Sequence, residues 1–106
     1  MTQDAFQPLG PTVNFTGATS APTAVQPNPS NVVNTNFRFV NSGAVTVFLG
    51  TGATAALAGT AASVTTGIPL VAGSATVMSF PAGTFFTGIT ASSTAVVYVT
   101  QGQGLL

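Results

Sequence analysis

The chain has 106 residues, one acidic and one basic side chain, and neither histidine nor cysteine. A charged fraction of 2%, against about 25% in an ordinary soluble domain, leaves no long-range field to attract nucleic acid or an anionic membrane surface. The same composition excludes disulfides, thiolate metal sites and the paired titratable groups that general acid-base catalysis and hydrolytic triads require.

Residues 1–11 are predicted to form an extended arm, because Pro8 and Pro11 disfavour helix and hold their predecessors in β or polyproline geometry. The arm either frays or docks on a neighbouring subunit through Phe6 and Leu9. No basic segment followed by an apolar run occurs here, so we expect no secretory signal in the chain as given. Gly, Thr and Ser also interrupt every apolar window before about 18 residues accumulate, which argues against a membrane span.

Two short strands and a loop are predicted next. Residues 12–18 alternate weakly, with Val13 and Phe15 on one side, and residues 21–25 form a second short strand. Residues 26–31, Gln-Pro-Asn-Pro-Ser-Asn, are predicted to be a loop because prolines and asparagines leave few ladder donors.

The stretch 36–49 carries the clearest β pattern. Phe37 and Phe39 share one face of a first strand, and Val47 and Leu49 share one face of a second. Between the two strands lie Asn41, Ser42 and Gly43, residue types that tolerate φ > 0. We therefore predict a tight reversal at 41–43 and a β-hairpin.

Arg38, the only basic residue, stands between Phe37 and Phe39, so its side chain leaves the opposite face of the strand. It is either a solvated side chain on the outer face or a contact at a subunit interface. In the second case its partner is a set of carbonyl groups or Asp4 from a neighbour's arm.

Residues 53–62 mix helix-favouring alanines with Gly59 and threonines, and we predict a loop with at most one helical turn. Residues 63–66 are predicted to form a short strand. Residues 67–71 are predicted to form an edge strand, because Pro69 cannot donate to a ladder.

Three further strands are predicted over residues 74–80, 84–90 and 95–100, with turns at Ala72-Gly73 and Pro81-Ala82-Gly83. In the second of these strands Phe85 and Phe86 fall on opposite faces. The tail, residues 101–106, is predicted to be flexible because of its glycines. Its last residues, Leu105 and Leu106, either fray or insert into a partner's groove.

The fold class that follows is all-β: a single small antiparallel β-sandwich or jelly-roll-like domain over residues 12–100, with the arm 1–11 before it and the tail 101–106 after it. The near absence of charge removes the repulsion that keeps copies apart. Either polar uncharged side chains solvate a monomer or the chain associates, and we favour association. The candidate interface residues are Phe6, Leu9, Arg38, Leu105 and Leu106.

Two stretches of the chain carry a resemblance to a known family. One is residues 67–104, G-I-P-L-V-A-G-S-A-T-V-M-S-F-P-A-G-T-F-F-T-G-I-T-A-S-S-T-A-V-V-Y-V-T-Q-G-Q-G, and the other is the preceding F-R-F-V-N-S-G-A-V-T-V-F-L-G-T-G. They resemble small structural proteins of tailed-bacteriophage virions, of the capsid decoration (cement) type. The resemblance implies a non-enzymatic protein on the outer surface of the capsid. Its partners would be the major capsid protein and itself, as a homotrimer. No catalytic, cofactor or metal residues follow from it, and no nucleic acid, membrane or small-molecule substrate is expected.

Alternatives remain beside this interpretation. A head-fibre or tail sandwich that binds a receptor or glycan would need aromatic residues on loops, whereas tryptophan is absent and the only tyrosine, Tyr98, lies in a predicted strand. A neck or tail structural component is a second alternative. A filament-forming subunit, suggested by neutral threonine-rich strands, is a third.

Overall fold

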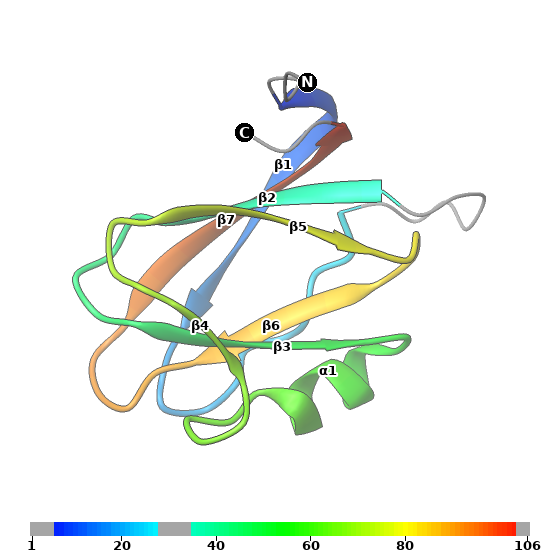
Figure 1. Cartoon of the computed structure of the whole chain (residues 1–106). Coiled ribbons are helices and arrows are strands. Elements are labelled where there is room, and N and C mark those ends of the chain that lie inside the picture. Colours follow the sequence, from blue (N-terminus) through cyan, green and yellow to red (C-terminus); the bar gives the residue numbers. More distant parts are fainter. Residues whose placement is uncertain (1–5, 28–34, 104–106) are drawn as a thin grey trace.

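The computed structural model describes residues 6–27 and 35–103, which form two antiparallel β-sheets packed face to face (Figure 1). The strands are β1 (Gln7–Gly17), β2 (Thr35–Asn41), β3 (Val47–Gly52), β4 (Ile68–Leu70), β5 (Ala75–Phe80), β6 (Phe85–Ile89) and β7 (Ala95–Gln103), and a helix, α1 (Ala55–Ala61), follows β3. One sheet has the order β1-β7-β2-β5 and the other the order β4-β3-β6. The predicted all-β sandwich is confirmed.

The core lies between the sheets and is built on phenylalanines. The ring of Phe86 lies 5.1 Å from the rings of Phe37 and Phe39 and 5.2 Å from that of Phe80, centroid to centroid, in edge-on arrangements that aromatic pairs favour. Phe37 and Phe39 are buried, as their alternation predicted, and Phe86 is buried while Phe85 is only partly so. The remaining buried members are Phe15, Val47, Leu49, Leu70, Ala95, Val97 and Val99.

The predicted hairpin at residues 41–43 is wrong. β2 pairs with β5 and β7 in one sheet, whereas β3 pairs with β4 and β6 in the other, so the chain crosses between layers at this point. Gly43 has no positive φ; it is needed because a Cβ there would overlap the Cβ of Ala95. The corner is held by the fully buried Asn41, whose side-chain nitrogen donates to the carbonyl oxygens of Val45 and Leu70 at 2.9 and 2.7 Å.

The expected boundaries of the arm and the tail also change. Strand β1 begins at Gln7, inside the predicted arm, and β7 continues to Gln103, inside the predicted tail; Gln7 pairs with Gln103 and Pro8 with Gly102. Gly102 is one of the glycines for which the tail was predicted to be flexible. The strand requires it, because a Cβ at this position would lie 2.6 Å from Cζ of Phe6. The start of β1 and the end of β7 therefore run side by side (Figure 1).

Two short strands predicted from the sequence are absent. In residues 21–25 only Val25 pairs, exchanging two 2.8 Å backbone hydrogen bonds with Phe86. Residues 63–66 form a turn instead of a strand, since the hydroxyl of Ser63 accepts from the backbone N–H of Thr65 at 3.2 Å and competes with a ladder. Of the predicted loop 26–31, residues 28–31 lie outside the described residues.

Helix α1 is longer than the single turn that we expected. Thr54 caps it, its hydroxyl accepting from the N–H of Leu57. The helix packs against β3. A Cβ at Gly52 would lie 2.6 Å from Cβ of Leu57, so the helix can approach β3 this closely because glycine stands at that position. The edge strand predicted around Pro69 is confirmed as β4, and the predicted turns at Gly73 and Gly83 have φ of +74° and +85°.

Candidate functional site

The outer face of the larger sheet is built from four paired strands, β1, β7, β2 and β5. Because side chains alternate along each strand, the residues between the buried ones point away from the core. The pairing of the strands sets them in two rows across the sheet. One row runs Thr12, Thr100, Arg38, Val77, and the next runs Asn14, Tyr98, Val40, Ala75. This outer face carries hydroxyl, amide, aromatic and aliphatic groups and a single charge.

A pocket of about 400 Å³ opens at one end of the outer face, lined by Phe6, Pro8, Thr12, Arg38 and Thr100. The hydroxyls of Thr12 and Thr100 lie 2.7 Å apart and bond to each other. Within the described residues the side chain of Arg38 makes no hydrogen bond or ion pair. Its planar group of five donors is thus available to an acceptor from outside these residues.

Two of the five predicted interface residues, Phe6 and Arg38, meet in this Arg38 pocket. Leu9 lies on β1 with 49% of its surface exposed, so it remains available for a contact. Leu105, Leu106 and Asp4 lie outside the described residues. Phe6 was expected either to fray with the arm or to dock on a neighbouring subunit; in the structure its ring packs against Gly102 of the same chain, and docking stays a prediction.

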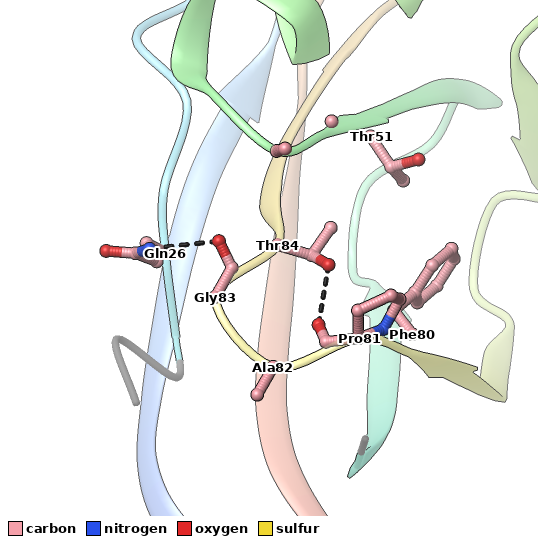
Figure 2. Close-up of a pocket in the computed structure, with 9 residues that line it drawn as sticks. Gln26, Thr51, Phe80, Pro81, Ala82, Gly83 and Thr84 are labelled. Atoms are coloured by element: carbon pink, nitrogen blue, oxygen red, sulfur yellow. Dashed lines mark hydrogen bonds between the residues drawn. The ribbon is translucent and has the colours of Figure 1, made fainter. Parts of the chain in front are cut away.

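A second groove, of about 460 Å³, lies where the end of β3 meets the turn between β5 and β6 and is drawn in Figure 2. Two hydrogen bonds fix its walls: Gln26 Nε2 donates to the carbonyl oxygen of Gly83 at 2.9 Å, and Thr84 Oγ1 donates to that of Pro81 at 2.6 Å. Thr51, Ala82 and the ring of Phe80 complete the lining that Figure 2 labels. None of the described residues that line the groove is charged.

No pattern in the sequence indicated this groove. The turn Pro81-Ala82-Gly83 was predicted, but its closeness to Gln26 and Thr51 depends on packing between segments that are far apart in the chain. A local pattern contains no signal for such a contact.

The chemistry available to the two pockets is that of neutral hydrogen-bonding groups, one guanidinium and two phenylalanine rings. Among the described residues no three His, Cys, Asp or Glu side chains gather in a group that could hold a metal ion. Residues 6–27 and 35–103 contain no helix long and apolar enough to cross a bilayer. The groups that line the two pockets can bind a partner by packing and by hydrogen bonds.

Comparison of the chain with protein-family models, with curated proteins and with solved structures finds no match.

Proposed function

We propose that the chain is a non-enzymatic structural protein of a virion, which binds the outer surface of the capsid and stabilises the shell. The observation that carries the proposal is the outer face of the four-stranded sheet, where Arg38 is the one charged side chain in rows of Thr, Asn, Tyr, Val and Ala. Such a surface favours another protein over nucleic acid or an anionic membrane. The resemblance of residues 37–52 and 67–104 to decoration proteins supplies the identity of that partner, the major capsid protein.

The stabilisation would act by mass action. Each copy that binds the assembled lattice, and not the loosened one, shifts the equilibrium toward the assembled state. The contact surface would include the outer face, the Arg38 pocket and the exposed Leu9. On the capsid surface the chain would also associate with further copies of itself, as a trimer.

The first test is the copy number of this chain relative to the major shell subunit in intact particles, measured by quantitative mass spectrometry. A ratio near one, or another ratio set by the lattice, supports decoration of the whole shell. A few copies per particle would replace it with a neck, tail or vertex component. Absence from particles would overturn the proposal.

A second test uses salt. The described residues can offer a partner one cation, Arg38, and a surface ion pair contributes at most about 1 kcal/mol. Screening it completely should therefore weaken capsid binding by no more than about fivefold. The Arg38→Gln variant should lose this small dependence and keep most of its affinity. A steeper loss of wild-type binding with added salt would contradict a contact made by packing and neutral hydrogen bonds.

A receptor- or glycan-binding sandwich is the second candidate, and one observation favours it. Tyr98 lies within a strand as predicted, yet 42% of its surface is exposed in the middle of the outer face, where its ring could stack on a sugar. A glycan array with the wild type and the Tyr98→Ala variant tests this. Signals that the variant loses would favour recognition over decoration.

A further inference from the structure

The two sheets present four edge strands, and two of these are blocked. β4 has only three residues and includes Pro69, which has no N–H to donate. The edge of β6 is covered by the chain itself, since Val25 exchanges two 2.8 Å hydrogen bonds with Phe86. Neither edge offers a free ladder to another strand.

The two edges of the larger sheet differ from each other. β1 carries Pro8 and Pro11, and its pairing with β7 shifts register between Pro8 and Thr12; prolines and bulges of this kind are how native sheets blunt an edge. β5 is a run of six residues, Ala-Thr-Val-Met-Ser-Phe, with no proline, glycine or charge, and no register shift interrupts its pairing with β2. β5 is therefore the one edge without these protective devices among the described strands.

The backbone groups that β5 turns outward can be identified. The N–H of Asn41 donates to the carbonyl oxygen of Ser74 at 3.0 Å. Because antiparallel pairs alternate between bonded and non-bonded positions, Thr76 and the residues two apart from it bond to β2. Ala75 and Val77 consequently direct their N–H and C=O groups away from the sheet. In the described part of the chain these groups have no partner.

We propose that β5 pairs antiparallel with β5 of a second copy of this chain, about a two-fold axis that passes Thr76. In this register Ala75 of each copy faces Val77 of the other, and the two residues exchange backbone hydrogen bonds on both sides of the axis. The two larger sheets then form one continuous sheet of eight strands, four from each copy. The outer faces of the two copies become one surface.

The absence of charge is the reason for choosing a second copy as the occupant. Identical strands that meet across a two-fold axis bring like side chains together, which is destabilising where they are charged. In β5 every side chain is uncharged, so self-pairing carries no repulsion. Thr76 meets Thr76 beneath the joined sheet, and Val77 meets Ala75 above it. This inference goes beyond the proposed function and does not depend on it.

A charge pair placed at the junction tests the proposal. Val77 is partly exposed on the outer face, beside Arg38 of β2. Val77→Glu therefore places an opposite charge next to Arg38 and Val77→Lys a like one; circular dichroism and thermal unfolding will check that both variants fold. Sedimentation equilibrium of the wild type should show a monomer–dimer equilibrium. Each variant alone should dimerise about two- to fivefold more weakly, because its two like charges then lie diagonally across the axis, each opposite Ala75 of the other copy. An equimolar mixture of the two variants should recover the association.

The matched control is the other open edge of the same sheet. Asn14 is exposed on β1, and Asn14→Lys adds the same charge there; this variant should dimerise as the wild type does. Loss of dimer with Asn14→Lys instead of Val77→Lys would overturn the proposal in favour of β1. A monomeric wild type, or a trimer unaffected by either variant, would also overturn it, and would leave the capsid proposal standing.

Hydrogen exchange supplies an independent measurement. The amides of Ala75 and Val77 should exchange more slowly as the protein concentration rises, since dimerisation gives them acceptors. Exchange at these amides that is the same at all concentrations would contradict the pairing.

Discussion

The substitution Asn41→Asp has an effect that follows directly from the structure and that depends on pH. Asn41 is fully buried at the corner between the sheets. The two hydrogens of its Nδ2 go to the carbonyl oxygens of Val45 and Leu70, and its Oδ1 accepts from the N–H of Gly43 at 3.0 Å. In the variant an oxygen replaces Nδ2. A protonated carboxyl can donate to only one of the two carbonyls, and an ionised one to neither.

The size of the effect can be worked out in two parts. At acidic pH one buried carbonyl oxygen loses its donor, which costs about 1 to 3 kcal/mol. At neutral pH burial and the neighbouring carbonyl oxygens disfavour the ionised form and raise the pKa of the introduced carboxyl above its unfolded value of about 3.9. Each unit by which the pKa rises adds about 1.4 kcal/mol to the cost at neutral pH. The loss at neutral pH is therefore a large part of the stability of a small domain, about 5 to 15 kcal/mol.

The sign of the pH dependence follows from linkage. The folded variant holds its proton to higher pH than the unfolded chain does, so its free energy of unfolding is highest below about pH 4 and falls as pH rises toward the raised pKa. The wild type has one acidic side chain and no histidine, so its free energy of unfolding should stay nearly constant from about pH 5 to 8. Urea denaturation followed by far-ultraviolet circular dichroism, repeated at each pH, measures both curves.

The exposed Asn14 provides the control for Asn41→Asp. Asn14→Asp puts the same carboxyl on the outer face of β1 and should change the free energy of unfolding by no more than about 0.5 kcal/mol at any pH. If the destabilisation by Asn41→Asp is the same at every pH, the side chain does not lie between two carbonyl oxygens, and the reasoning fails.

The other predictions concern packing. Phe86→Ala removes the ring at the centre of the aromatic core and should lower the free energy of unfolding by about 3 to 5 kcal/mol, while Phe85→Ala, on the opposite face of β6, should cost less than half of that; equal losses in urea denaturation would show that the faces are misassigned. Gly102→Ala brings a Cβ into the carbonyl oxygen of Gln7 and should destabilise by about 1 to 3 kcal/mol, with faster hydrogen exchange at the start of β1. The same change at Gly59, in helix α1 with no atom within 4 Å of the new Cβ, should instead stabilise by about 0.5 to 1 kcal/mol; a loss of stability there would contradict the placement of the helix.

The candidate sites were only partly open to prediction. That Arg38 leaves the face opposite Phe37 and Phe39 could be read from alternation alone, and its exposure agrees. Alternation could not predict that Phe6 lies in the same pocket as Arg38, because this depends on the pairing of β1 with the end of β7. The groove beside Gln26 gave no sequence signal, since its walls come from segments far apart in the chain.

The sequence by itself determined most of the strands, the faces that they bury and the neutrality of the surface, because a period of two and a residue count are local properties. Only the tertiary structure decided which strands pair. β2 and β3 have the patterns of a hairpin, yet they lie in different sheets, because the buried amide of Asn41 and the close approach of Gly43 to Ala95 turn the chain from one layer to the other. The prolines and glycines of the predicted arm and tail likewise did not prevent strand formation, because each segment pairs with the other, about 95 residues away in sequence. Ladder hydrogen bonds and packing offset the conformational entropy lost on closing even a long loop.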